Sequence, residues 1–300
     1  MDDSLAGREY ASHLSDADLA LLASLAGPDA SHGRESGASG PADVSSLRAD
    51  PVALLRLLEH PGLFRAVLGP AQGDRGWAVP ASPFLVFAVL VQRAATELAS
   101  VGHVPERTGP RQRVPLFDAP ALREFLSAPA RRLFLAELLA SFTRVASGRY
   151  RVAAGGRTRT RRFSELDPVR LAGLLEAVPE AERPGIYRRL GDVTLFLTGV
   201  FPNYAADRAL GPVGAARLLR AAGLPAAEQD RLAGPPGIEL WEYLGARWYR
   251  AARDLAPVST ARITLVGDVA DRFRQARRVL NHLADRYLLA SGNPWFGQPA

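Results

Sequence analysis

Apolar residues near the C-terminus recur in alternating steps of three and four, which is the repeat of helices packed along a seam. In the last long predicted helix, the repeating residues are Val266, Val269, Phe273, Ala276, Leu280, Leu283 and Tyr287. In the preceding predicted helix, they are Trp241, Leu244, Trp248, Ala251 and Leu255. Since only a short connection at residues 257–260 separates the two, the sequence predicts an antiparallel helix pair.

Helix-start signals recur through the rest of the chain. An N-cap residue followed by proline occurs at residues 50–51, 82–83 and 167–168, and Pro129 and Pro184 stand at two further predicted starts. The predicted helices run over residues 15–25 with Ser15 as cap, 50–68 with an interruption at 60–62, 82–101, 119–126, 129–147, 167–178, 184–201, 211–222 and 225–232. The fold class is therefore all-α, a multi-helical bundle of two lobes.

The chain divides into five predicted parts. Residues 1–47 form an acidic, flexible N-terminal arm with a short helix, because Gly, Ser, Ala and Pro dominate the stretch after that helix. Residues 48–148 and 165–290 form an N-terminal and a C-terminal helical lobe. Residues 149–164 form a basic β-hairpin at the junction of the lobes, and residues 291–300 form a tail.

Charge is unevenly distributed along the chain. The first 50 residues hold nine acidic residues and three arginines, whereas the whole chain carries a net charge of +6. An acidic arm ahead of a basic body can dock on that body or shield it from a polyanion. Within the body, the Pro-, Gly- and Arg-rich stretch at residues 102–115 is predicted as a loop.

Composition excludes several kinds of chemistry. The chain has no cysteine, which rules out disulfides, thiolate nucleophiles and cysteine-based zinc sites. All 37 basic residues are arginine, which rules out lysine Schiff bases and Walker-type phosphate loops. The longest apolar runs, at residues 84–91 and 193–201, fall well short of the ~20 residues that span a bilayer. With no signal-peptide pattern at the N-terminus, a cytoplasmic protein without membrane contact is expected.

Candidate metal ligands are sparse. His282 and Asp285 form a His-x-x-Asp pair, but the seam assignment turns both outward, and one pair supplies too few ligands. A surface ion pair is the expected arrangement. Arg188 and Asp192, four residues apart, are expected to pair at the edge of the core. We therefore expect no catalytic residue, metal or cofactor.

An arginine-rich segment near the middle of the chain predicts a β-hairpin around Gly155-Gly156. A two-residue turn would place Tyr150 opposite Arg161, Val152 opposite Arg159 and Ala154 opposite Arg157 on one face. The other face would pair Arg149 with Arg162 and Arg151 with Thr160. The six arginines of the segment are Arg149, Arg151, Arg157, Arg159, Arg161 and Arg162. With no acid on either face, this hairpin should project into water or onto an anionic partner.

The functional interpretation of the hairpin is a finger that holds nucleic-acid phosphates, and the plain alternative is a solvated ribbon. A sequence-reading winged helix would also need a recognition helix just before the hairpin. The predicted helix over 129–147 shows only a narrow polar stripe, which is typical of a core helix. A backbone-contacting finger is therefore favoured over groove reading.

A small-ligand pocket in the C-terminal lobe is a further possibility. Its candidate residues are the aromatic and acidic side chains Tyr187, Asp192, Trp241, Tyr243 and Trp248. The two tryptophans lie one heptad apart, which is more typical of core residues than of a ligand platform.

Two phrases in the C-terminal lobe resemble motifs of a family of uncharacterised bacterial proteins. They are LGDVTLFLTGVFP at residues 190–202 and WEYLGARWY at residues 241–249. The resemblance leaves out the hairpin and the first lobe. It implies a bacterial, cytoplasmic helical fold and no assigned activity.

Three functions stay open at this point. The first, slightly favoured, is a non-catalytic interaction or regulatory protein whose helical surfaces bind a protein partner or form a homodimer. The second is a nucleic-acid-associated protein that uses the arginine hairpin as a phosphate clamp. The third is a small-ligand binder or an enzyme with a site in the C-terminal lobe.

Overall fold

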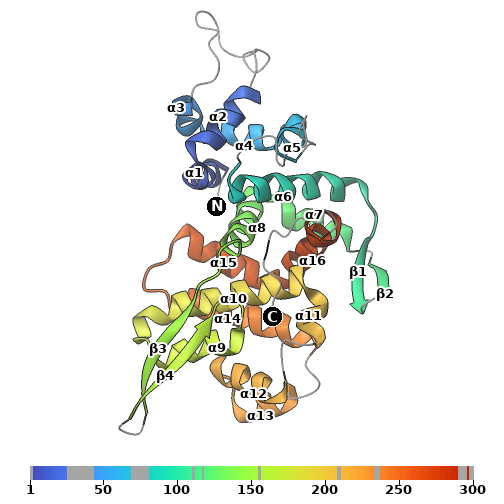
Figure 1. Ribbon diagram of the computed structural model, residues 1–300. Coiled ribbons are helices and arrows are strands. Elements are labelled where there is room, and N and C mark those ends of the chain that lie inside the picture. The colour runs from blue at the N-terminus through green and yellow to red at the C-terminus, as the bar shows by residue number, and fades with distance from the viewer. Residues whose placement is uncertain are drawn as a thin grey trace, which may run out of the picture. The chain divides into compact units, whose positions relative to one another are not determined.

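The computed structural model is mainly helical, which confirms the all-α class (Figure 1). It describes residues 3–25, 44–68, 81–109, 112–116, 118–154, 157–207, 211–232, 237–289 and 296. The chain forms two compact units. Unit 1 comprises Met1–Val101 and Leu126–Ala140, and unit 2 comprises Gly102–Phe125 and Ser141–Ala300. The predicted division at other boundaries stays a prediction.

Unit 1 is built from short helices around one long apolar helix, α6. Its helices are α1 (Asp3–His13), α2 (Asp16–Leu25), α3 (Val44–Ala49), α4 (Pro51–Leu58), α5 (Pro61–Leu68), α6 (Pro83–Ser100) and nearly all of α8 (Pro129–Ser141). Within unit 1, α1 packs against α4, and α5 packs against α6. The run from Phe84 to Val91 in α6 is buried on every side, as its all-apolar sequence predicts.

The first 25 residues are more helical than the sequence predicts. Only the second of their two helices, α2, is predicted, and Leu19 and Leu22 of that helix are fully buried. Asp18 links the start of α2 to the start of α6. Its carboxylate accepts hydrogen bonds from the Ser15 N–H at 2.9 Å and, at the start of α6, from the Ser82 N–H at 2.8 Å. The predicted Ser15 cap is confirmed, because its hydroxyl accepts from the Asp18 N–H at 3.2 Å.

The proline-marked helix starts are confirmed by their caps. The side chains of Asp50, Ser82 and Asp167 each accept a hydrogen bond from the backbone N–H three residues on, at 3.0, 3.2 and 3.1 Å. Two predicted helix ends are wrong. The helix α8 ends at Ser141, not near residue 147, and the helix after Asp167 ends at Ala172 and continues only as a 3-10 turn.

Length and hydropathy single out α6 among the described helices as one that could cross a membrane. Its mean hydropathy is 1.2, and 56% of the stretch is buried in the fold. A buried core helix passes the same test, so the finding is weak evidence for a membrane span.

Unit 2 is organised around α10 (Arg183–Val200), whose residues from Leu190 to Val200 are all buried. The other helical elements of unit 2 are most of α7 (Ala119–Ser127), α9 (Pro168–Ala172), η2 (Gly173–Glu176), η3 (Glu180–Glu182), α11 (Pro202–Asp207), α12 (Pro212–Ala221), α13 (Ala226–Leu232), α14 (Ile238–Asp254), α15 (Ala261–Asp271), α16 (Phe273–Leu283) and the π-helical turn η4 (Ala284–Leu288). The most extensive packing of α10 is against α14.

Close approach between α10 and α14 depends on glycine. A Cβ atom on Gly191 would lie 2.3 Å from Cδ1 of Tyr249, inside the ring's van der Waals envelope. A Cβ atom on Gly245 would lie 2.2 Å from Cζ of Phe273. These two positions therefore act as notches that receive aromatic rings from neighbouring helices.

The predicted packing of the two helices is confirmed, but the predicted seam is not confirmed in full, because Leu255 is 45% exposed and the last helix is not continuous. As expected, α14 packs against α15, and Trp241, Leu244 and Trp248 are fully buried. The last helix, predicted as continuous, breaks at Arg272 (φ −117°, ψ 28°) into α15 and α16. After the break the chain changes its main partner, because α16 packs chiefly against α10.

Two antiparallel hairpins complete the described part of unit 2. The predicted one consists of β3 (Ser147–Ala154) and β4 (Arg157–Ser164). The second, β1 (Val104–Gly109) paired with β2 (Gln112–Leu116), falls where the sequence predicts a loop. That prediction is wrong. Pro105 and Pro115 stand opposite each other, and in a two-stranded sheet both strands are edge strands. An edge strand tolerates a proline, because the missing N–H is not needed for pairing with a further strand.

Candidate anion-binding site

The β3–β4 ribbon has the register that the sequence predicts. Tyr150 lies opposite Arg161, Val152 opposite Arg159, and Arg149 opposite Arg162. The turn at residues 155–156 lies outside the described residues, and so does the side chain of Arg157, although its backbone is part of β4. The alternation of the strands therefore separates the described arginines into two faces.

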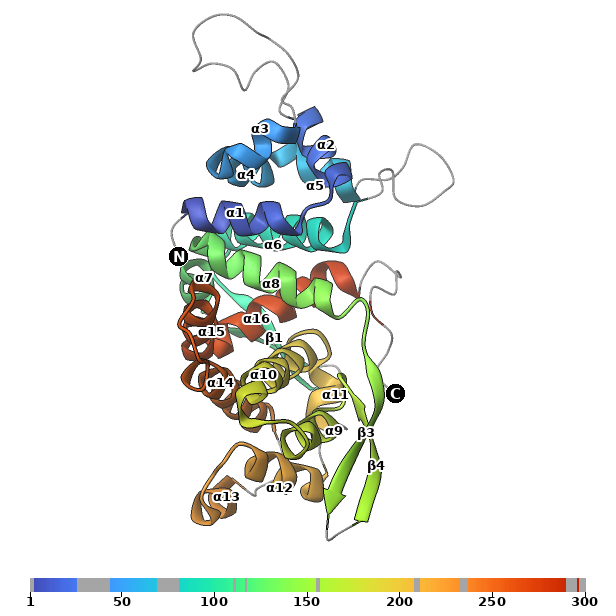
Figure 2. The ribbon, with the colours of Figure 1, turned by 90° about the vertical axis from the view of Figure 1, so that its left-hand side faces the viewer.

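One face of the ribbon is partly covered, contrary to the expectation that both would be open, although Arg159 and Arg161 on that face are exposed. Val152 is 9% exposed, and Tyr150 is half-buried. β4 packs against α9 (Figure 2), and a Cβ atom on Gly173 would lie 2.6 Å from the Tyr150 hydroxyl. We call this the inner face. On this face Arg161 forms an exposed ion pair with a carboxylate outside the hairpin, Glu176, at 2.8 Å.

The outer face carries a row of arginines without acidic neighbours. Arg149, Arg151 and Arg162 are all exposed, and the threonines between them on β4 are exposed as well. None of the three forms an ion pair with a carboxylate in the described part of the chain. Since Arg149 and Arg162 stand directly opposite each other, their like charges oppose the pairing. An anion on this face would relieve that repulsion.

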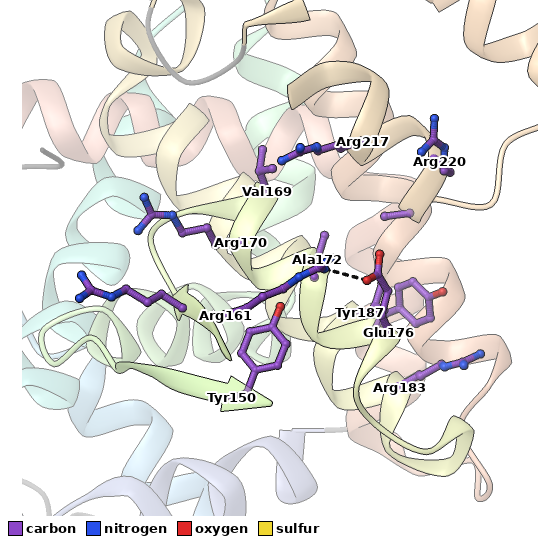
Figure 3. A pocket seen from close by; sticks show the side chains of 14 residues that line it. Tyr150, Arg161, Val169, Arg170, Ala172, Glu176, Arg183, Tyr187, Arg217 and Arg220 are labelled. Atoms are coloured by element: carbon purple, nitrogen blue, oxygen red, sulfur yellow. Dashed lines mark hydrogen bonds and ion pairs between the residues drawn. The ribbon is translucent and has the colours of Figure 1, made fainter. Parts of the chain in front are cut away.

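A cleft of about 920 Å³ lies beside the inner face (Figure 3). It is walled by β3 and β4, by α9 with η2, by the first turns of α10 and by α12. One carboxylate, Glu176, and two tyrosines, Tyr150 and Tyr187, line it. Its arginines are Arg161, Arg162, Arg170, Arg183, Arg217 and Arg220. The lining is therefore strongly cationic.

The few acids near the cleft neutralise only part of this charge. Glu176 pairs with Arg161, and its negative charge raises the pKa of Arg161 above the ordinary value. Arg170 pairs with Asp167 at 3.0 Å. The Nε of Arg183 is buried and has no hydrogen-bond partner in the described part of the molecule. A buried donor without an acceptor is costly, but this atom is covered by protein and is not open to the cleft.

The five residues predicted as a ligand pocket do not converge. Tyr187 lines the cleft, whereas Trp241 and Trp248 are fully buried core residues. The Trp241 Nε1 donates to the carbonyl of Ala205 at 2.9 Å. Tyr243 donates to Glu228 at 2.7 Å, at a separate place on α14. Only Tyr187 of the five therefore belongs to the candidate site.

Asp192 is engaged inside the core of unit 2. It accepts hydrogen bonds from Arg188 Nε at 3.0 Å and from the Tyr249 hydroxyl at 2.8 Å. The predicted pair of Arg188 with Asp192 is thus confirmed. Burial and the charge of Asp192 raise the pKa of Tyr249 well above its ordinary value. A carboxylate satisfied in this way is a structural group, not an available base.

The structure offers little to a metal ion. Asp285, the predicted partner of His282, lies 3.3 Å from Arg113 of β2 in an ion pair. Among the described residues, no three His, Asp or Glu side chains group together in a way that could hold a metal.

Sequence reasoning found the ribbon but not the cleft. The cleft residues outside the hairpin come from three helical segments, and nothing in the sequence says that these segments meet. The one available signal is the spacing of Arg217 and Arg220, which places both on one side of α12.

No protein-family model, no curated protein and no solved structure matches this chain. The resemblance of residues 190–202 and 241–249 to a bacterial family stays a prediction. The chain is a mostly helical protein whose candidate site consists of the two faces of the β3–β4 ribbon and the adjoining cleft.

Proposed function

We propose that this chain is a non-catalytic, nucleic-acid-associated protein that contacts the phosphate backbone with the outer face of the β3–β4 ribbon. The observation that carries the proposal is the exposed row of Arg149, Arg151 and Arg162, unpaired with any described carboxylate. Guanidinium groups bind phosphate oxygens in a bidentate fashion. Each neutralised phosphate also releases counterions, so a short arginine row gives measurable, salt-sensitive affinity.

The surroundings of the ribbon favour backbone contact over base reading. The helix that packs on β4 is α9, which has five residues. A recognition helix must be long enough to lie in the major groove and present several side chains to base edges. A helix of little more than one turn cannot do so. We therefore expect weak dependence on nucleic-acid sequence.

The interaction-protein hypothesis has less support at the paired C-terminal helices. The apolar side chains of Trp241, Leu244 and Trp248 are used within unit 2, so they do not form an apolar stripe for a partner. A protein partner or homodimer at another surface stays a prediction. Bacterial origin and a cytoplasmic location likewise stay predictions.

The test is the affinity of the full chain for nucleic acid at two salt concentrations. Fluorescence anisotropy with labelled single- and double-stranded DNA and RNA should show binding at ~50 mM salt that weakens steeply by ~200 mM. The double variant Arg149→Ala/Arg151→Ala should lower the slope of log K against log salt by about 2 on duplex DNA.

A matched control separates the ribbon from general charge. Arg56→Ala/Arg65→Ala removes two exposed arginines from unit 1 and changes the net charge equally. It should bind nucleic acid like the wild type. Absence of binding at ~50 mM salt, or an equal loss in both double variants, would contradict the proposal.

A further inference from the structure

We propose that the cleft beside the inner face is a second, separate site, which binds a nucleoside polyphosphate. The site goes beyond the nucleic-acid contact proposed above, because it is concave, lies beside the inner face and includes Arg162 but neither Arg149 nor Arg151 of the outer row. Its volume of about 920 Å³ is that of a small-molecule pocket. A duplex cannot enter such a space, whereas a mononucleotide with several phosphates can.

The charge of the lining selects for a multiply charged anion. Arg161 and Arg170 already have carboxylate partners in Glu176 and Asp167. Arg183, Arg217 and Arg220 have none in the described part of the chain. In Figure 3 Arg161 of β4 points to Glu176, while Arg217 and Arg220 come from α12. Several guanidinium groups around one space repel one another, and a ligand with a chain of phosphates neutralises them together.

Arg183 of α10 contributes a positive charge to the lining of the cleft. Its Nε is buried against the protein and lacks an acceptor, although the residue lines the cleft. The guanidinium charge of Arg183 adds to the cationic lining and favours a phosphate in the cleft.

The tyrosines distinguish a nucleotide from a bare phosphate chain. Tyr150 and Tyr187 line the cleft from β3 and α10, and both rings are half-buried. Inorganic polyphosphate would need only the arginines. Aromatic rings beside a cationic lining are the combination that binds a base by stacking and its phosphates by charge. The ligand class is therefore a nucleoside carrying two or three phosphates.

Isothermal titration of the full chain with ATP, AMP, adenosine and inorganic tripolyphosphate tests this site. ATP should bind with one-to-one stoichiometry and more tightly than AMP, and adenosine should not bind measurably. Arg217→Ala/Arg220→Ala, at two exposed positions of α12, should weaken ATP binding by about tenfold or more. Arg183→Ala should weaken it by about tenfold as well. Unchanged ATP affinity in both variants, or no ATP binding at ~1 mM, would overturn the proposal.

The role of the aromatic rings has its own readout. Tyr187→Ala should weaken ATP binding about fivefold or more and leave tripolyphosphate binding unchanged, whereas Tyr187→Phe should bind ATP normally. Equal affinity for ATP and tripolyphosphate in the wild type would show that the Tyr187 ring does not contribute to ATP binding. The far-ultraviolet circular dichroism of each variant checks that the fold is retained.

The two proposals fail independently. Arg149 and Arg151 do not line the cleft, so Arg149→Ala/Arg151→Ala should weaken ATP binding much less than Arg217→Ala/Arg220→Ala does. ATP binding without nucleic-acid binding would contradict only the ribbon proposal. Nucleic-acid binding without ATP binding would contradict only the cleft proposal.

Discussion

At the scale of single residues, the buried carboxylate of Asp192 in unit 2 has two hydrogen-bond donors. The carboxylate is 7% exposed and accepts from both Arg188 and Tyr249. Burying such a charge without donors would cost several kcal/mol. The Tyr249 hydroxyl therefore stabilises the fold by serving the carboxylate, and the ring fills the notch at Gly191.

The raised pKa of Tyr249 predicts a loss of stability in alkaline solution. In the unfolded chain the tyrosine loses its proton near its ordinary value of 10.0, while the folded chain retains it to higher pH. The stabilisation is thus complete below about pH 10 and is lost as the pH rises through the folded-state pKa. Tyr249→Phe should lower the free energy of unfolding at pH 7 by about 1–2 kcal/mol and make the alkaline decline shallower.

Urea unfolding between pH 7 and about pH 11 measures both effects. Tyr204→Phe, which removes a hydroxyl at a half-buried position of α11, is the control for stability at pH 7. An alkaline decline as steep in Tyr249→Phe as in the wild type would show that another group titrates.

At the scale of elements, the central position of α10 depends on glycines, which leave room for neighbouring helices. This helix combines an all-buried second half with Gly191 and Gly199, where a Cβ atom would overlap the side chains of Tyr249 in α14 and Leu280 in α16. Small residues let helix axes come together and let rings and branched side chains pack against backbone. The apolar run alone predicts a buried helix, and the glycines determine how near its neighbours lie.

Two glycines of α10 give a matched test of this packing. Gly191→Ala should destabilise the protein by about 1–3 kcal/mol, because the new methyl group overlaps the Tyr249 ring. Gly185→Ala, near the start of the same helix, meets nothing within 4 Å and should be neutral or stabilising by up to about 1 kcal/mol. Thermal unfolding of both variants measures the difference. Similar melting temperatures for the two variants would show that the close approach is easily relaxed.

At the scale of the whole molecule, the features that the sequence predicts are those determined by interactions between residues a few positions apart. The caps at Asp50, Ser82 and Asp167 and the register of the β3–β4 ribbon are of this kind. A cap or a tight turn carries its own hydrogen bonds, so its sequence signal is complete.

Features decided by tertiary packing could not be predicted in the same way. The break at Arg272 follows from a change of packing partner, and local helical periodicity continues across it. The cleft depends on β4, α9, α10 and α12 meeting, and each contributes arginines that look like ordinary surface residues in the sequence. The sequence gives the number of positively charged side chains but not where they come together in the folded chain.

The β3–β4 ribbon is thin enough that its two faces share one electrostatic field. Arg161 points to the cleft, while Arg162, its neighbour in β4, belongs to the outer face and also lines the cleft. A ligand with three or four negative charges on one side must reduce the attraction of a polyanion on the other. Thermodynamic linkage makes the effect mutual, so bound nucleic acid would weaken ATP binding by the same factor. Saturating ATP should therefore weaken nucleic-acid binding several-fold at ~50 mM salt, and anisotropy titrations with and without ATP measure that coupling.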